Sequence, residues 1–250
     1  MRKSEGERRM GRWKKAFFWL VGLILLFALI EYPIEFNSEK ASESNFSLPL
    51  TGKTIVLDPG HGGPDGGAVG SDGTLEKDIA LQVSQVLRNY LQEAGADVYL
   101  TRSEDKDLAS TETKGLSRRK AEDIRNRLQL IKEKDPDVFI SIHLNALSAT
   151  QWRGAQSFYF PNSEENKQLA KLIQNEIIRN LENTKRDALG INSMYLLKHA
   201  NVPSALVEIG FLSNVEEREL LKDEDYQNKM AASIYQGILR YVVDDEEIDK

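Results

Sequence analysis

From residue 53 onward, short apolar runs rich in β-branched residues alternate with longer stretches in which apolar residues recur at helical spacing. Several short runs are continuously apolar, as in strands covered on both faces. The predicted strands are 54–58, 97–101, 138–142, 155–160, 193–197 and 204–209. Strands that alternate with helices predict an α/β fold, a three-layer sandwich in which a mostly parallel, twisted sheet of about six strands is flanked by helices.

Apolar stripes with a spacing of three or four residues predict the helices of this sandwich. They extend over 75–91, 124–131, 169–181 and 226–241. Gly95 follows the first stripe as a stop signal. We therefore expect a catalytic domain over residues 53–243 and an acidic tail at 244–250.

The N-terminal part of the chain has a different pattern. Residues 1–15 carry seven basic and two acidic side chains, and residues 16–30 contain no charge. A basic segment followed by an apolar run is typical of an export signal. Because no convincing cleavage site follows directly, we expect a basic cytoplasmic segment at 1–15, an uncleaved signal-anchor at 16–32 and a polar tether at 33–52. The protein is then exported and anchored in the membrane, facing the extracytoplasmic space, or secreted if the signal is cleaved.

Composition and charge narrow the class of function. The formal net charge is −6 and residues 1–15 contribute +5, so the remaining chain carries −11. A body this acidic lacks the basic stripe expected of a nucleic-acid-binding protein. The chain contains no cysteine, which excludes a thiol nucleophile, disulfides and Cys-ligated metal sites.

Polar features occur at the ends of three predicted strands. The glycine-rich run 58–67, DPGHGGPDGG, presents His61 and lacks the lysine and Ser/Thr of a Walker A loop, which argues against a phosphate cradle. His143 stands where strand 138–142 stops, at the edge where open α/β sheets bind ligands. Glu208 lies in an apolar strand, where a charged carboxylate needs a cation or a catalytic use.

Two histidines and a carboxylate suit zinc with a fourth position open for water. The pattern does not choose the carboxylate, because no HExxH pair makes the choice local. The candidates are Glu76, Asp58, Asp65 and Glu208. Each feature also has a structural explanation, since a strand-end histidine can be structural, the glycine run can be only a turn, and Glu208 can pair with Arg102. The remaining histidine, His199, is predicted to be an exposed loop residue.

Five motifs in this order resemble the zinc N-acetylmuramoyl-L-alanine amidases of the amidase-3 family. They are DPGHGG at 58–63, LEKD at 75–78, LTR at 100–102, SIHLNA at 141–146 and VEIGFLSN at 207–214. The resemblance covers residues 53–243 and implies a Zn²⁺ cofactor bound by His61, Glu76 and His143. It also implies that Glu208 is the catalytic general base. The candidates for binding substrate or supporting these residues are Asp58, Asn145, Arg102 and Arg127.

The reaction implied by this resemblance is hydrolysis of the amide bond between N-acetylmuramic acid and L-alanine in peptidoglycan. The signal-anchor, the lack of wall-binding repeats and an insert at 108–122 are similar to the germination-specific, sporulation branch of the family. This implies a role in the spore cortex ahead of muramic lactam formation. The insert can line the substrate groove, bind a regulatory protein partner or be only a surface loop. The alternative functions are a non-catalytic peptidoglycan-binding protein on an amidase scaffold and another zinc hydrolase, a carboxypeptidase or deacetylase.

Overall fold

The computed structural model describes residues 13, 17, 19–24, 27 and 47–248. The chain divides into two compact units, Met1–Phe46 and Ser47–Lys250. The described residues of the first unit are helical. Within the described parts of the chain, no helix is both long and apolar enough to cross a membrane. The predicted basic segment, signal-anchor and tether fall largely outside the described residues.

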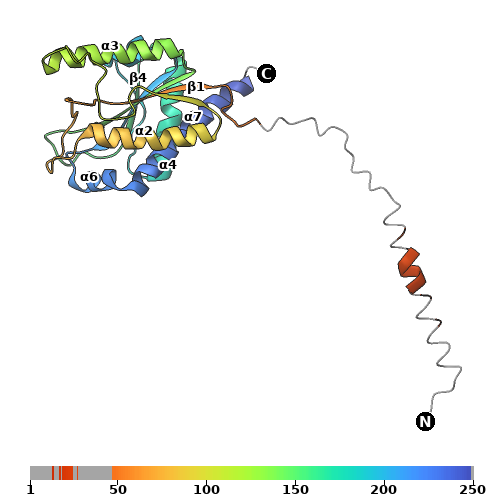
Figure 1. Cartoon of the computed structure of the whole chain (residues 1–250). Coiled ribbons are helices and arrows are strands. Elements are labelled where there is room, and N and C mark those ends of the chain that lie inside the picture. Colours follow the sequence, from red (N-terminus) through yellow and green to blue (C-terminus); the bar gives the residue numbers. More distant parts are fainter. Residues whose placement is uncertain (1–12, 14–16, 18, 25–26, 28–46, 249–250) are drawn as a thin grey trace. The chain divides into compact units, whose positions relative to one another are not determined.

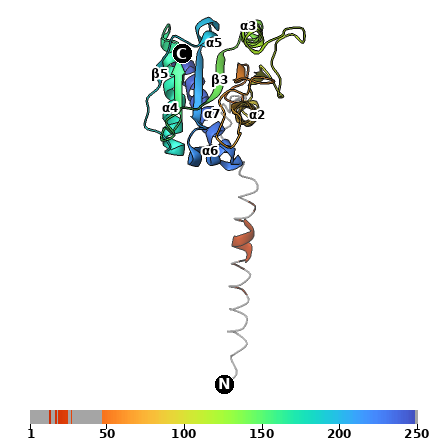
Figure 2. The same cartoon turned by 90° about the vertical axis from the view of Figure 1, so that its left-hand side faces the viewer.

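Six strands form one sheet in the unit Ser47–Lys250, in the order β2-β1-β3-β6-β4-β5 (Figure 1). They are β1 (Thr54–Pro59), β2 (Asp97–Leu100), β3 (Val138–Asn145), β4 (Gln156–Tyr159), β5 (Leu189–Gly190) and β6 (Ser204–Phe211). The first three and β6 pair in parallel, whereas β4 runs antiparallel to β6. Figure 2 shows β5 at one edge of the sheet. The predicted α/β fold with a mostly parallel sheet is confirmed.

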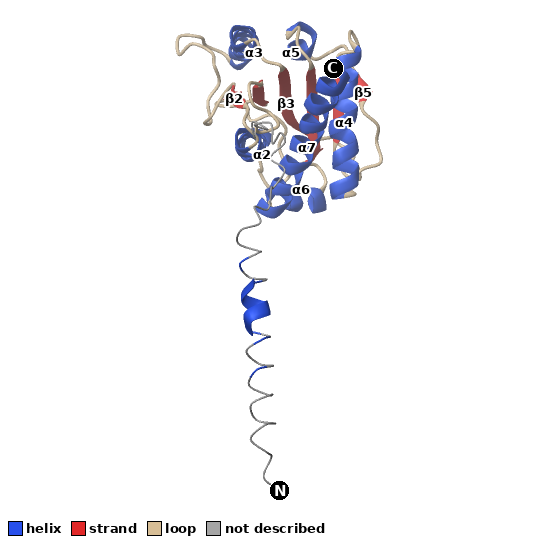
Figure 3. Cartoon of the chain, turned by 90° about the vertical axis from the view of Figure 1, so that its right-hand side faces the viewer, coloured by secondary structure: helices blue, strands red, loops and turns tan. Residues whose placement is uncertain are grey.

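Helices cover both faces of the sheet, which gives three layers (Figure 1). The first helical layer contains α2 (Glu76–Glu93), α4 (Glu164–Leu181) and α7 (Glu224–Ile248), and Figure 3 shows α4 and α7 in front of the strands. The second contains α3 (Leu116–Lys134) and α5 (Tyr195–His199), and α6 (Val215–Lys222) follows β6. Successive side chains of β1 point to opposite faces of the sheet. Ile55 and Leu57 belong to the larger core cluster, whereas Val56 belongs to the smaller cluster under α3 and α5.

Several elements differ from the sequence-based expectation. The short strand β5 and the helix α6 were not predicted, and two predicted segments take a different form. The prediction of a strand at 193–197 is wrong, because residues 195–197 belong to the one-turn helix α5. Its Leu197 is buried while Tyr195 is 43% exposed, and so short an apolar run fits either structure. The helix predicted at 124–131 begins earlier, at Leu116. The second half of the predicted insert is therefore the start of α3 rather than a loop.

Candidate functional site

Three side chains converge at the carboxyl ends of the parallel strands. His61 follows β1, His143 lies near the end of β3, and Glu76 is the first residue of α2. One ligand atom from each lies within 4.8 Å of the others. Glu76 Oε1 is 2.9 Å from His143 Nδ1, and Glu76 Oε2 is 3.2 Å from His61 Nε2. The structure thus brings together the three residues that the resemblance implied as metal ligands.

The backbone leaves room for this group and holds its carboxylate. A Cβ atom on Gly67 would lie 2.5 Å from Glu76 Oε2, and one on Gly60 would press against the ring of His143. The amides of Ala68 and Leu144 donate hydrogen bonds of 2.6 and 2.9 Å to the two Glu76 oxygens. The glycines of the run 58–67 are therefore needed for close approach rather than only for a turn.

A second carboxylate orients His61. Asp65 Oδ2 lies 2.8 Å from His61 Nδ1 and 2.9 Å from the Lys120 ammonium. An Nδ1–H donor to Asp65 leaves His61 Nε2, on the Glu76 side, free to bind a cation, as is usual for metal-binding histidines. The sequence left Asp65 as one of four candidate carboxylate ligands. In the structure it contacts His61 Nδ1 and is not one of the three converging residues. Lys120 comes from α3, and nothing in the sequence pattern marked it.

The electrostatics of this group fit a divalent cation. Burial would raise the pKa of the Glu76 carboxyl, but hydrogen bonds from His143 and His61 hold it well below its ordinary value. Burial would lower the pKa of His61, but Glu76 and Asp65 raise it. A deprotonated carboxylate between two imidazoles is a donor set that zinc prefers. The residues present therefore fit the implied metal.

We call His61, Glu76 and His143 the metal group. Glu208 on β6 lies beside it, on the strand next to the one that carries His143. It pairs in register with His143 on β3 and with Gln156 on β4, so the three side chains share one face of the sheet. Glu208 Oε2 is buried and has no hydrogen-bond partner among the described residues. Burial, reinforced by the charge of Glu76 and opposed by His143, raises the pKa of Glu208 to about 7. Such a carboxyl group can accept and return a proton near neutral pH.

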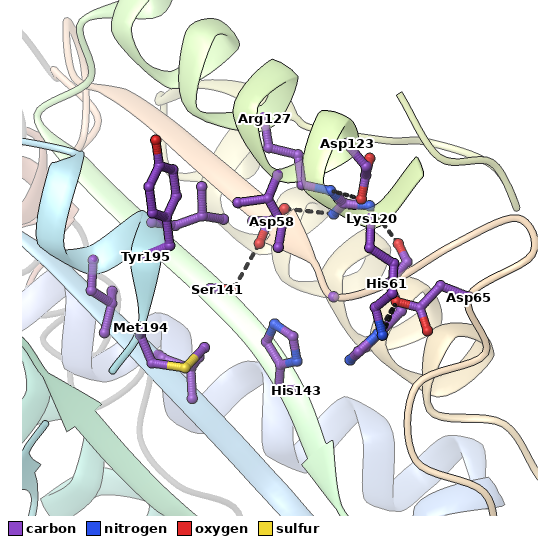
Figure 4. A pocket seen from close by; sticks show the side chains of 15 residues that line it. Asp58, His61, Asp65, Lys120, Asp123, Arg127, Ser141, His143, Met194 and Tyr195 are labelled. Atoms are coloured by element: carbon purple, nitrogen blue, oxygen red, sulfur yellow. Dashed lines mark hydrogen bonds and ion pairs between the residues drawn. The ribbon is translucent and has the colours of Figure 1, made fainter. Parts of the chain in front are cut away.

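Asp58 and Arg127 form a buried ion pair behind the loop, with a separation of 2.7 Å (Figure 4). Asp58 also accepts hydrogen bonds from the hydroxyls of Thr101 and Ser141. Burial would raise the pKa of Asp58, but Arg127 and these hydroxyls lower it to about 2. Arg127 donates in addition to the carbonyls of Pro59 and His61. These two candidates therefore hold the loop that carries His61.

Arg102 also holds this loop. It is 1% exposed and donates to backbone carbonyls of Pro59, Gly60 and Lys77. The alternative in which Arg102 neutralises Glu208 is therefore not what the structure shows. Asn145 pairs in register with Phe211 at the end of β3, and its predicted role stays a prediction.

His199 lies apart from the metal group. It is the last residue of α5, half-buried, with its ring centroid 4.5 Å from that of Tyr195. The prediction of an exposed loop residue is wrong, because the short apolar run before it folds as a helix. Besides Lys120, the structure adds Gln156 to the site. The sequence pattern missed Gln156 because the antiparallel direction of β4 is not visible in the sequence.

The fold and this arrangement define an α/β domain with a candidate metal centre at the carboxyl ends of its parallel strands. The sequence model of the N-acetylmuramoyl-L-alanine amidase family matches residues 55–240. The chain belongs to this family, and the family expected from the five motifs is confirmed.

The chain is similar to several known amidases. The germination-specific N-acetylmuramoyl-L-alanine amidase of Bacillus subtilis (strain 168) is 53% identical over 223 residues, which are 89% of this chain and 92% of that protein. The CwlD amidase from Clostridioides difficile, solved in complex with the GerS lipoprotein, superposes with a TM-score of 0.74 at 43% identity, over 76% of this chain and 98% of that one. An N-acetylmuramoyl-L-alanine amidase from Clostridium difficile 630 superposes with a TM-score of 0.67 at 30% identity, over 76% of this chain and 96% of that one.

Proposed function

We propose that this protein is a zinc-dependent N-acetylmuramoyl-L-alanine amidase that cleaves the amide bond between N-acetylmuramic acid and L-alanine in the peptidoglycan of the spore cortex. The observation that carries the proposal is the convergence of His61, Glu76 and His143 within 4.8 Å, beside a buried carboxylate oxygen of Glu208 that has no partner among the described residues. Family membership supports the reaction, and similarity to the germination-specific amidase supports the cortex as its setting.

The proposed chemistry divides the work between the metal and Glu208. A zinc ion held by His61, Glu76 and His143 would acidify a water molecule and polarise the scissile carbonyl. Glu208 accepts a proton from the attacking water on Oε2, and the water oxygen forms the new bond to the carbonyl carbon. When the C–N bond breaks, Glu208 passes the proton to the leaving nitrogen of L-alanine. The products are a lactyl carboxylate on the sugar and a peptide with a free amine.

Location and partners follow from the relatives and the N-terminal sequence. Peptidoglycan lies outside the cytoplasmic membrane, which supports export of the domain. The basic and apolar segments at 1–32 support an uncleaved membrane anchor, with 33–52 as tether and 53–243 as catalytic domain. Because the CwlD amidase is found in complex with the GerS lipoprotein, we include a lipoprotein partner in the proposal.

Product analysis of muropeptides tests the reaction. The purified protein with zinc should release free peptide with an L-alanine amine terminus, and metal analysis should find about one zinc per chain. The Glu208→Gln variant should retain the zinc and lose activity by about 10²–10⁴-fold. Cleavage at another bond would identify a carboxypeptidase or deacetylase, and binding of muropeptides without cleavage would identify a peptidoglycan-binding protein. Full activity of Glu208→Gln would remove Glu208 as the base.

A further inference from the structure

A cavity of about 110 Å³ opens beside the two histidines, between α3 and α5 (Figure 4). Its floor contains Ser141 and Leu206, both 2% exposed. Ile124 of α3 and the segment 194–197 form its walls. The interior is therefore largely apolar, although it adjoins a charged site.

Two cationic side chains line this cavity, and they differ in how fully they are paired. Arg127 is 2% exposed and is paired with both Asp58 and Asp123. Lys120 lies at the mouth, with its side chain 43% exposed, and forms an ion pair with Asp65 at 2.9 Å. An ammonium group has three N–H donors, so Lys120 can bind an incoming carboxylate and keep Asp65.

We propose, on the basis of the proposed function, that this cavity binds the peptide side of the substrate, with the L-alanine methyl group in the apolar interior and the α-carboxylate of the following residue on Lys120. The largely apolar lining of the cavity suits the methyl group of L-alanine. Sugar hydroxyls would also lose hydrogen bonds to water against Ile124 and Met194. The glycan is uncharged at this position, whereas a stem peptide carries carboxylates.

The charge requirement is tested with two soluble substrates, N-acetylmuramoyl-L-alanyl-D-glutamate with a free α-carboxylate and its D-isoglutamine form, in which that carboxylate is an amide. The zinc-loaded full chain should hydrolyse the carboxylate form with a roughly tenfold higher kcat/KM, mostly through KM. Lys120→Met should lose this preference, and Lys120→Arg should restore it. Lys132→Met, which removes an exposed lysine from the last turn of the same helix, should behave as wild type.

The zinc affinity of each variant separates a substrate contact from support of the metal through Asp65. Lys120→Met should bind zinc within about twofold of wild type. If it loses zinc affinity and slows on both substrates equally, Lys120 is a positioning residue for His61 and the proposal is wrong. If wild type hydrolyses both forms with the same KM, the proposal also fails while the amidase function stands. If neither substrate nor muropeptides are cleaved, it is the proposed function that fails.

The apolar part of the cavity is tested separately by narrowing it. Ile124→Phe should raise KM for the L-alanine substrate severalfold and leave KM for a glycine analogue nearly unchanged, because glycine has no methyl group to place. Thermal unfolding checks that the variant is folded. Equal losses on both substrates in a folded variant would place the L-alanine residue outside the cavity.

Discussion

At the scale of single residues, the side chain directly opposite Glu208 is uncharged. Gln156 faces Glu208 directly across the antiparallel pair of β4 and β6, and donates its Nε2 hydrogen bond to the Asp187 carbonyl at 2.9 Å. Side chains directly opposite on neighbouring strands lie about 5 Å apart at Cβ. Because the Gln156 amide is uncharged, the pKa of Glu208 is set by burial and by the charges of His61, Glu76 and His143.

Gln156→Glu should disturb this balance. A second carboxylate opposite Glu208 raises the pKa of Glu208 further, since ionising both groups costs Coulomb energy. The acid limb of the pH–rate profile should move to higher pH by about one pH unit, and activity near pH 7 should fall. Gln129→Glu, which adds the same charge on the exposed side of α3, should leave the profile unchanged. An unshifted acid limb in Gln156→Glu would mean that this limb does not report Glu208.

The Asp58–Arg127 pair should make stability depend on acid pH. In the folded protein the pKa of Asp58 is about 2, below its ordinary value of 3.8. The contribution of the ionised Asp58 to the free energy of unfolding is therefore complete above about pH 4 and is lost as the pH falls through about 2. Asp58→Asn should cost about 3 kcal/mol at pH 7 in urea unfolding. The difference from wild type should shrink as the pH is lowered from about 4 to 2. Asp187→Asn, at an exposed carboxylate, should stay within about 0.5 kcal/mol. If the difference between Asp58→Asn and wild type does not change with pH, the destabilisation does not come from loss of the ion pair with Arg127.

At the scale of elements, the layer behind the sheet depends on one close helix contact. A Cβ atom on Gly237 of α7 would lie 2.7 Å from the backbone nitrogen of Ile173 in α4. Backbone cannot move aside as a flexible side chain can. The contact therefore fixes the distance between α7 and α4, and both belong to the core under β3 and β6.

Gly237→Ala tests this contact. Alanine favours a helix by about 1 kcal/mol over glycine, yet we expect net destabilisation by about 1–3 kcal/mol because the helices must separate. Chemical denaturation measures it. Asn228→Ala on the exposed side of α7 is the control and should be neutral or slightly stabilising. If Gly237→Ala is stabilising, the helices can separate at little cost.

The elements also show what the sequence could predict. His61 and His143 were found because each ends an apolar strand, and parallel strands end at one edge. Glu76 was not found from the pattern alone, since an acidic residue at a helix start is ordinary and only the turn 58–67 brings it to the histidines. Lys120 and Gln156 depend on the docking of α3 and the direction of β4, neither of which leaves a local signal. The run 193–197 was assigned to the wrong element because five residues are too few to show a period.

At the scale of the whole molecule, the fold is contained in one unit. All six strands and their helices lie in Ser47–Lys250. The sheet, both core clusters and the candidate site therefore draw on no residue before 47 among those described.

A chain that begins at Ser47 should accordingly fold and work alone. Its thermal midpoint should be within about 2 °C of that of the full chain in detergent, with equal kcat on soluble muropeptides. Circular dichroism and product analysis measure both. A chain that begins at Thr54 is the informative comparison, because it lacks Leu50, which is fully buried, and should lose about 2 kcal/mol or more. Loss of folding in the chain that begins at Ser47 would show that residues 1–46 contribute to the domain.

The three residues of the metal group are separated by long stretches of chain. Only 15 positions separate His61 from Glu76, but His143 is 67 positions further on. The three side chains come together only after β1 and β3 have paired and α2 has packed against the sheet. An unfolded or half-folded chain would present these ligands singly, and a single histidine or carboxylate binds zinc weakly. Metal uptake would thus report the completion of folding, and the ion would add its binding energy to the finished domain alone.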